Sequence, residues 1–341
     1  MLALALLAGC DDDDGFQPDE PLDGGNRDAA ATVPDSGIDA GADAGPGQKR
    51  IELKFAAHFT DQGELECGQS YTGQGTKQSE VTPKDFRFYV QSVKLKATTG
   101  EEVALKFDDL TSGGFQTSEI ALLDFTTSGG ECEGGPTASN TVIKGTVPAN
   151  LTYNGVHVVI GVPETLNHSD PTKAPAPLQA PGASWDWVAG YRFLIAEVLT
   201  TTNADAGTPH GGGMDAGHDA HGGGDAGGGH SAGDAGGGHG GHGEAEPGLG
   251  FVHLGSTGCT KNGEQYSCTK QNRAEFTLTG FDPDRDTIKA DVGAVFGTAD
   301  LSGAVQCHGS GASCTPMFDQ LGVDISTGAP NGLQKVFSVS R

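Results

Sequence analysis

The sequence predicts an all-β protein: an antiparallel β-sandwich or barrel-like domain with disulfides, interrupted by a long disordered insert. Three observations lead to this fold class. Short runs of alternating apolar and polar residues begin near residue 50, no long helical stretch lies between them, and the cysteines beyond the N-terminal segment are even in number. β-Branched and aromatic residues at period two suit a half-buried pleated surface.

Six runs show this alternation, and each is bounded by Gly, Asp, Asn or Pro. They are IELKFAAHF (51–59), FRFYVQSVKLKA (86–97), EVALKF (102–107), GVHVVIGV (155–162), RFLIAEVLT (192–200) and AEFTLTGF (274–281). Strands of this length and spacing favour a sandwich or barrel over a βαβ sheet. Helix is expected in one or two short segments, with IKADVGAVFG (288–297) the best candidate because Ile288, Val292 and Val295 recur at helical spacing.

The N-terminal segment is expected to lie outside the fold. MLALALLAGC (1–10) is typical of a bacterial lipoprotein signal peptide in which Cys10 is lipidated. The apolar run is too short for a transmembrane helix, which needs about 20 apolar residues. Residues 11–49 are rich in Asp, Gly, Ala and Pro and predict a disordered acidic tether. The expected location is the periplasm or the outer cell surface, with the protein lipid-anchored to a bacterial membrane.

The charge balance argues against a nucleic-acid partner. The chain has 45 acidic and 20 basic residues, a net charge of -25, and much of the excess lies in the tether and the insert. Nucleic-acid binding requires a positive surface that displaces the counterions of phosphate groups. No basic patch is present in the sequence.

The cysteines predict three disulfides. Besides Cys10 there are six, at Cys67, Cys132, Cys259, Cys268, Cys307 and Cys314, and an even number in an exported chain favours full pairing. Six cysteines allow 15 pairings. Cys259 with Cys268 and Cys307 with Cys314 would close short loops, which leaves Cys67 with Cys132. A zinc or thiolate site is the alternative, although no C-x-x-C pair is present.

Residues 203–247 form a low-complexity insert of Gly, Ala, Asp and His that interrupts the domain expected at 50–341. The insert has too few large apolar residues to build a core and predicts a flexible loop. Its six histidines are His210, His218, His221, His230, His239 and His242. Histidine-rich tracts bind Cu(II), Zn(II) or Ni(II) weakly. The alternative is a repeat without function, because similar Asp-Ala-Gly repeats without histidine occur in the tether.

Three histidines of the folded region are candidate metal ligands. His168 lies in GVPETLNHSD (161–170), in a loop expected after a strand, and His253 lies in FVHLGSTGC (251–259), on a strand that leads into Cys259. His308 follows Cys307 and is a weaker third candidate. Imidazole is the commonest ligand of copper and zinc, and Asp170 or the backbone is expected to orient the His168 ring. The alternative for His168 is a structural hydrogen-bonding role in its loop.

The only two tryptophans, Trp185 and Trp187, stand in WDWVAGYRF (185–193), and on a strand they would face the same side of a sheet. Packing in the core under Tyr191 and Phe193 is one interpretation. A tryptophan beside a metal can instead be oxidised or tune the metal's potential.

These segments, with DFRFYVQSVKL (85–95) and the cysteines near Cys67 and Cys259, resemble the MbnP family of methanobactin-associated periplasmic copper proteins. The resemblance spans about 50–200 and 248–341 and implies copper, with His168 and His253 as the nearest ligand candidates. It also implies that Trp185 or Trp187 is oxidised to kynurenine by a partner, a dihaem cytochrome c peroxidase-like enzyme. The histidine-rich insert departs from the family pattern.

The motif content argues against an enzyme. The sequence has no H-E-x-x-H and no glycine-rich phosphate loop between a strand and a helix. We therefore expect an exported, lipid-anchored copper-binding protein that serves in copper storage, acquisition or handover. The alternative is a structural or adhesive surface lipoprotein with no specific metal site.

Overall fold

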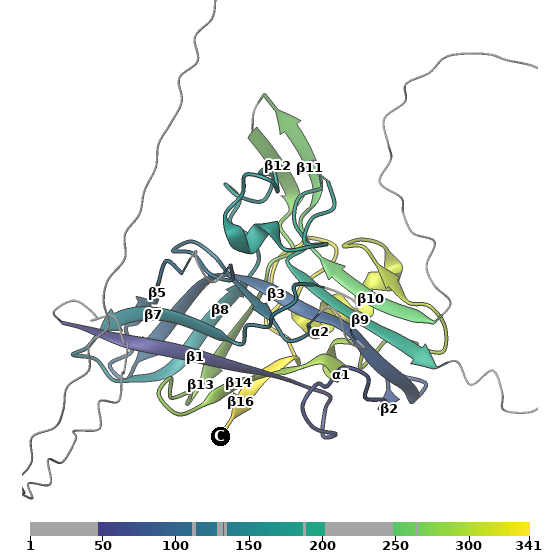
Figure 1. The fold of residues 1–341 in the computed structure, drawn as a ribbon, viewed down its shortest axis with the longest axis horizontal. Helices are drawn as coiled ribbons and strands as arrows, with labels where there is room; N and C mark the ends of the chain where they lie inside the picture. The colour runs from purple at the N-terminus through teal and green to yellow at the C-terminus, as the bar shows by residue number, and fades with distance from the viewer. Residues whose placement is uncertain are drawn as a thin grey trace, which may run out of the picture. The chain divides into compact units, whose positions relative to one another are not determined.

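The computed structural model of the chain consists mainly of β-strands in two large sheets and one short ribbon (Figure 1). It describes residues 47–110, 114–127, 132, 135–186, 189–201, 248–263 and 265–341. Cys10, the leader, the tether up to residue 46, Trp187 and the insert at 203–247 with its six histidines lie outside the described residues. The described residues belong to one unit, Asp43–Arg341.

The smaller of the two sheets has five strands. In order across the sheet they are β16 (Phe337–Ser340), β14 (Thr287–Asp291), β1 (Gln48–His58), β7 (Val142–Pro148) and β5 (Lys106–Phe107). Along β1 the side chains of Ile51, Leu53 and Phe55 are buried and alternate with exposed ones, as the sequence pattern predicts for a strand with one face in the core. β1 pairs antiparallel with β7 and parallel with β14.

The larger sheet has nine strands. Six of them follow the order β13 (Ala274–Thr279), β8 (Tyr153–Ile160), β3 (Ser79–Ala97), β9 (Leu194–Thr201), β10 (Leu249–Leu254) and β15 (Gln306–Cys307). The other three pair with β3: β2 (Tyr71–Gln74), β4 (Glu102–Ala104) and β6 (Ala121–Asp124). The predicted run 102–107 is thus divided, because β4 joins this sheet whereas β5 joins the smaller one.

The two sheets enclose one large hydrophobic core. Phe55 of β1 lies edge-on to Phe88 of β3, with ring centroids 6.1 Å apart, and Phe88 also meets Phe337 of β16 at 5.6 Å. All three side chains are buried. These contacts between strands of different sheets confirm the predicted β-sandwich class.

Strand β3 supports a second, smaller cluster on its other face. Phe86 and Phe88 point into the main core, whereas Tyr89 packs with Tyr191 and Phe193 in a separate buried group. The Tyr89 hydroxyl donates to the carbonyl of Pro177, within the short 3-10 helix η2 (Ala176–Gln179). This cluster anchors the connection between β8 and β9, and that connection carries His168 and Trp185.

The predicted helix at 288–297 is largely wrong. Residues 287–291 form β14, in which Ile288 and Ala290 are buried and their neighbours are half-buried, and only α1 (Val292–Val295) is helical. The spacing of Ile288, Val292 and Val295 imitates a helix. Pairing with β1 on one side and β16 on the other nevertheless stabilises a strand, and Asp291 then caps α1 by accepting from the Ala294 amide.

The remaining elements lie in the C-terminal third of the chain. A two-stranded ribbon, β11 (Thr257–Asn262) and β12 (Gln265–Lys270), projects from the sandwich (Figure 1). Two further short helices follow, η3 (Ala312–Cys314) and α2 (Thr315–Leu321). Within the described part of the chain, no helix has the length and apolar character needed to cross a membrane.

Three disulfides join the pairs that the cysteine spacing favours. Cys67 is bonded to Cys132, Cys259 to Cys268 across the ribbon, and Cys307 of β15 to Cys314 of η3. Cys132, Cys307 and Cys314 are fully buried, whereas both cysteines of the ribbon are partly exposed. The first bond ties together segments 65 residues apart, and the other two close short loops.

Candidate metal centre

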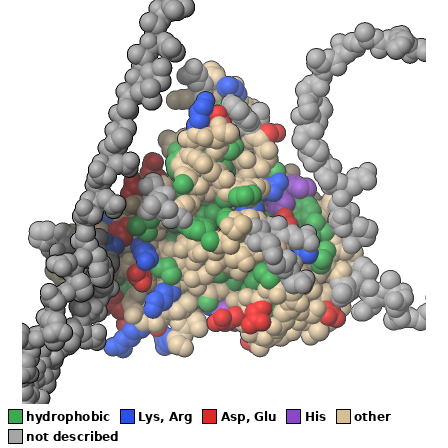
Figure 2. All heavy atoms as spheres, viewed as in Figure 1, with side chains coloured by type: hydrophobic (Ala, Val, Ile, Leu, Met, Phe, Trp, Pro, Cys, Tyr) green, Lys and Arg blue, Asp and Glu red, His purple; other side chains and the backbone are tan. Residues whose placement is uncertain are grey.

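Strands β9, β10 and β15 bring a histidine pair together at one side of the larger sheet. The parallel pairing of Val252 with Cys307 places the next residue of each segment, His253 and His308, beside one another. Their ring centroids are 5.4 Å apart. The Cys307–Cys314 disulfide holds the segment that carries His308. In the space-filling view, histidine side chains gather at the surface beside a basic side chain (Figure 2).

His253 is prepared as a ligand by its partner on β9. Its side chain is 5 % exposed, and its Nε2 lies 2.6 Å from the Oε1 of Glu197. Burial lowers the pKa of His253 and outweighs the opposite effect of the Glu197 hydrogen bond, so the ring is neutral at neutral pH. With Nε2–H donating to the carboxylate, Nδ1 holds the lone pair. This Nδ1 is buried and has no hydrogen-bond partner among the described residues.

The Glu197 carboxylate is anionic in this setting. Burial raises its pKa, but the hydrogen bond from His253 and the charges of Arg192 and Arg87 outweigh burial, so the pKa lies below its ordinary value. A carboxylate that accepts from one imidazole nitrogen fixes the tautomer and makes the other nitrogen a better donor to a metal. Glu197 and His253 thus form the carboxylate–histidine unit of many metal centres.

The two histidines of the pair share an aromatic neighbour but differ in their exposure to solvent. Phe251, two residues before His253 on the same face of β10, stacks on the His253 ring at 4.6 Å and also contacts His308 at 4.6 Å. His308 is exposed, whereas Phe251 and His253 are buried. The site therefore has one buried imidazole and one at the surface, and a metal ion can reach it from the His308 side.

Trp185 lies directly beside this histidine pair. A Cβ atom on Gly255 would be 2.5 Å from the Cζ3 of Trp185, and one on Gly309 would be 3.6 Å from its Cη2. The six-membered ring of the indole therefore fits against two glycines that follow His253 and His308 closely in the chain. The Arg192 guanidinium lies 5.8 Å from the ring centroid, and the buried Nε1 has no hydrogen-bond partner among the described residues.

Trp185 is neither on a strand nor in either core cluster. It is half-buried in the loop that the isolated bridge between Ser184 and Tyr191 closes. The interpretation of Trp185 as a core tryptophan under Tyr191 and Phe193 is therefore wrong. The same-face argument for the two tryptophans assumed a strand, which Trp185 does not join.

Asp85 and Arg87 of β3 and Asp124 of β6 form a buried charge network. The Nη2 of Arg87 is 3.0 Å from the Oδ2 of Asp85, and all three charged residues, including Asp124, are almost fully buried. Burial raises the pKa of Asp85 to about 7 against the opposing charge of Arg87, and it raises the pKa of Asp124 to about 6 against its hydrogen bonds with Thr126. A Cβ atom on neighbouring Gly182 would contact both Arg87 and Arg192, so this network borders the histidine site.

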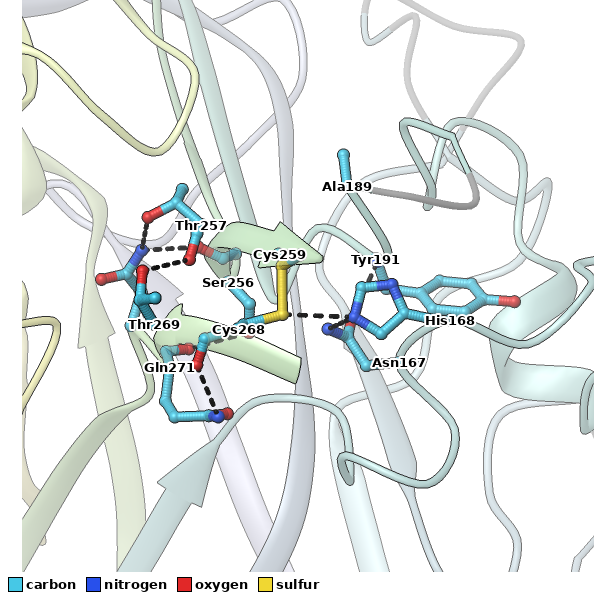
Figure 3. The surroundings of a disulfide bond; sticks show 12 residues. Asn167, His168, Ala189, Tyr191, Ser256, Thr257, Cys259, Cys268, Thr269 and Gln271 are labelled. Carbon is cyan, nitrogen blue, oxygen red and sulfur yellow. Dashed lines mark hydrogen bonds between the residues drawn. A yellow bond between two sulfur atoms is a disulfide. The ribbon is translucent and has the colours of Figure 1, made fainter. Parts of the chain in front are cut away.

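His168 is placed elsewhere, against the disulfide of the ribbon (Figure 3). Its Nε2 lies 3.3 Å from the Sγ of Cys268, and its ring stacks on Tyr266 with centroids 4.4 Å apart. His168, Cys259 and Cys268 are the one group of three His, Cys, Asp or Glu side chains in the described ranges whose ligand atoms all lie within 4.8 Å of one another. Because the two sulfurs are bonded to each other, only the imidazole is a strong ligand in this state.

The three predicted ligands thus fall at two positions. His253 and His308 meet, whereas His168 belongs to the ribbon site, in the loop after β8 as expected. Of the two ring-orienting partners expected for His168, Asp170 accepts hydrogen bonds from Thr172 and forms an ion pair with Lys173. The adjacent Asn167 amide contacts the His168 ring, at 3.2 Å.

Sequence reasoning missed Glu197, Arg192 and Asn167. A signal for Glu197 was present, because it is the lone acid in RFLIAEVLT, with apolar residues on both sides of it, and an acid in such a strand needs a buried partner. Its pairing with His253 depends on the register of β9 against β10, which puts Glu197 opposite Phe251 and diagonal to His253.

The fold and the site define a disulfide-bonded β-sandwich that carries a carboxylate-held histidine pair beside a loop tryptophan. A comparison with family models identifies the family. The MbnP model matches residues 48–310, most of the chain, so the chain belongs to the MbnP family.

A solved structure agrees with this assignment at the level of the fold. MbnP from Methylosinus trichosporium superimposes with a TM-score of 0.64 and 23 % sequence identity, over 86 % of this chain and 98 % of that one. A comparison with curated proteins finds no match.

Proposed function

We propose that this protein binds copper at His253 and His308, outside the cytoplasm, and stores it or hands it on. The observation that carries the proposal is the buried Nδ1 of His253, a lone pair without a partner among the described residues and beside a second imidazole, while Glu197 holds the other nitrogen. Imidazole ligands suit copper. Membership of the MbnP family supports copper over other metals.

The proposal includes a modified tryptophan. Trp185 packs against the glycines that follow both histidines, so a kynurenine formed from it would have its aromatic amine and ketone next to the copper ligands. A dihaem cytochrome c peroxidase-like partner would carry out the oxidation. Chemistry thus resides in the partner, and the chain itself acts as a binding protein rather than an enzyme. Lipidation at Cys10 would keep the protein at a membrane surface.

Copper titration tests the site. The full chain, produced with the dihaem partner, is titrated with copper against a chromophoric chelator that outcompetes the weak histidines of the insert. We expect about one tightly held copper ion, because ligands fixed on strands lose less entropy on binding than ligands on a flexible segment. His308→Ala should abolish the tight site without unfolding the protein, since His308 is exposed.

His157→Ala is the matched control, because His157 is a partly exposed imidazole on β8 that is bonded to Thr277. It should leave the tight copper ion in place. Tight binding that survives both His308→Ala and His253→Gln would refute the ligand assignment, whereas an original chain that holds no tight copper ion would favour a structural or adhesive lipoprotein. Peptide mass spectrometry of protein from the native host separately tests the kynurenine, which requires a changed mass at Trp185.

Glu197→Gln tests the carboxylate. The amide retains an acceptor for His253 but loses the charge, and we expect copper affinity to fall by about 10- to 100-fold, as for other residues that orient metal-bound histidines. Unchanged affinity in this variant would show that His253 needs no orienting carboxylate. The Zn(II) affinity of the same variant provides a second readout.

A further inference from the structure

We propose that Cys259, Cys268 and His168 form a second, redox-gated metal site, which binds a thiophilic ion, Cu(I) or Zn(II), when the ribbon disulfide is reduced. The site uses none of the residues of the histidine pair. It therefore stands or falls independently of the proposed copper function.

The ligand atoms are already within reach of one ion. A tetrahedral ion with bonds of about 2.3 Å to sulfur and about 2.0 Å to nitrogen separates the two ligand atoms by about 3.5 Å. In the structure the Nε2 of His168 and the Sγ of Cys268 are 3.3 Å apart. Cys259 lies directly opposite Cys268 in the ribbon, so its thiolate would complete a set of two sulfurs and one nitrogen. Thiolate ligands select Cu(I) and Zn(II).

The tautomer of His168 suits this role. The Oδ1 of Asn167 accepts from the Tyr191 amide at 3.0 Å, which fixes the orientation of the Asn167 side chain, and its Nδ2 therefore faces the His168 Nε2 at 3.2 Å. Since an amide NH₂ group only donates, Nε2 must be the acceptor. The lone pair of His168 thus lies on the nitrogen beside the disulfide, in the form that binds metals (Figure 3).

The position of the ring is fixed as well. Tyr266 stacks on the imidazole and lies two residues before Cys268 on β12, so both side chains project from the same face of the ribbon toward His168. Asn167, which is 2 % exposed, holds the loop in place by accepting a hydrogen bond from the Tyr191 amide. A preformed ligand geometry of this kind reduces the entropy lost when an ion binds.

The disulfide is accessible to a reductant. Both of its cysteines are partly exposed on the projecting ribbon. His168, which contacts Cys268, also lines a cleft of about 480 Å³ with Glu164, Gln265 and Tyr266. In each of the other two disulfides at least one cysteine is fully buried. No residue of the ribbon belongs to either described core cluster, so opening the bond leaves the packing of the sandwich intact.

Opening the bond requires a two-electron reductant, for example a dithiol. A dithiol transfers two electrons and two protons to the Cys259–Cys268 bond, which breaks to give two thiols while the dithiol itself closes to a disulfide. Binding of the ion then releases the two thiol protons and forms two metal–sulfur bonds and one metal–nitrogen bond. Oxidation would reverse the sequence and expel the ion.

The test compares oxidised and reduced full-length protein. A phosphine reductant is applied under native conditions and removed without oxygen, alkylation and mass spectrometry confirm free thiols at Cys259 and Cys268, and circular dichroism confirms the fold. Zn(II) and Cu(I) are then titrated separately against chromophoric chelators. We expect the reduced protein to bind one more equivalent than the oxidised protein, with thiolate-to-metal charge-transfer absorption, and the two titrations show which ion is preferred.

Two variants isolate the ligands. Cys259→Ser/Cys268→Ser should abolish the extra equivalent while retaining the insert and the histidine pair. His168→Phe keeps a ring against Tyr266 but removes the nitrogen, and it should weaken binding by more than about 100-fold, beyond the loss typical when only an orienting partner of a ligand is changed. His253→Gln/His308→Ala should leave this site unchanged, which separates its failure from that of the proposed function.

Three results would overturn the inference. The first is a reduced protein that binds no more metal than the Cys259→Ser/Cys268→Ser variant. The second is a His168→Phe variant that binds the metal as tightly as the original chain. The third is a disulfide that can be reduced only when the fold is lost.

Discussion

Gly255→Ala tests whether the close approach of Trp185 to β10 shapes the site. The new methyl carbon would lie 2.5 Å from the Cζ3 of Trp185 and 2.7 Å from the carbonyl oxygen of Tyr191. Carbon atoms in contact are separated by about 3.5–4.0 Å, so the indole ring must move by about 1 Å. Tyr191 cannot yield as readily, because its amide is bonded to the buried Asn167.

The expected cost follows from these contacts. Overpacking of this kind destabilises the folded state by about 1–3 kcal/mol. Replacing a glycine within or beside a strand stabilises the folded state by about 0.5–1 kcal/mol. We expect a net loss of about 1–2 kcal/mol, which lowers the melting temperature by about 2–8 °C in a domain of this size. The backbone of Gly255 does not have a positive φ, so the contact alone causes the loss.

Gly250→Ala, on β10 itself, is the matched control for Gly255, the residue that follows β10. Its methyl group would be close only to side-chain methyl groups of Leu301 and Val198, at 3.2 and 3.3 Å, which need to move by a few tenths of an ångström, and would be in ordinary contact with the Val198 carbonyl oxygen at 3.8 Å. Urea unfolding gives the stabilities, and tryptophan fluorescence reports the ring, since Trp185 and Trp187 are the only tryptophans. If Gly255→Ala is as stable as Gly250→Ala and keeps the original emission spectrum, Trp185 does not pack as described.

Three further predictions concern the domain as a whole. The folded state keeps protons on Asp85, with a pKa of about 7, and Asp124, with a pKa of about 6, at pH values where the unfolded chain has released them. The free energy of unfolding should therefore fall as pH rises from about 4 to about 7, by about 1.4 kcal/mol per pH unit for each retained proton. His253, whose pKa is lowered, makes the free energy of unfolding rise with pH up to its unfolded pKa of about 6.5, but two carboxyls outweigh one imidazole below pH 6. Urea titrations at several pH values measure the dependence of the free energy of unfolding on pH, and Asp85→Asn should make this dependence weaker. Replacing the Cys67–Cys132 pair by serines should cost about 4 kcal/mol and the Cys259–Cys268 pair about 3 kcal/mol, because the first closes the longer loop, and equal losses would contradict the chain-entropy argument. Replacing residues 203–247 by a short Gly-Ser linker should leave the melting temperature nearly unchanged, because the Thr200 amide already donates to the Gly248 carbonyl at 2.6 Å, and a drop of more than a few degrees would reveal a stabilising role of the insert.

The strands were predictable because their signal is local. In β1, Ile51, Leu53 and Phe55 alternate with polar residues, and any sheet that buries one face of the strand satisfies this pattern. In β14, by contrast, the spacing of Ile288, Val292 and Val295 fits a helix equally well. The outcome there depends on β1, more than 200 residues earlier in the chain, which local periodicity cannot register.

The candidate site was predictable in its histidines but not in its grouping. His253 and His308 stood out by their residue type and their nearby cysteines, yet their contact arises from the parallel pairing of β10 with a two-residue strand, β15. His253 lies on a strand, as expected, but it is buried there, so its replacement perturbs packing as well as ligation. Burial of Asp85 and Arg87 was equally hidden, since charged residues in a strand usually face solvent.

The two-sided burial of β3 determines how the protein opens. Phe86 and Phe88 serve the main core while Tyr89, on the same stretch of backbone, serves the cluster that holds the loop with His168 and Trp185. Release of that loop strips a central strand of half its packing, so loop and sandwich should exchange their amide protons in one event. The ribbon shares no such backbone and should open on its own, at lower free energy. A protease or a chaperone would thus encounter a sandwich and a loop that open together, and a ribbon that opens separately from them.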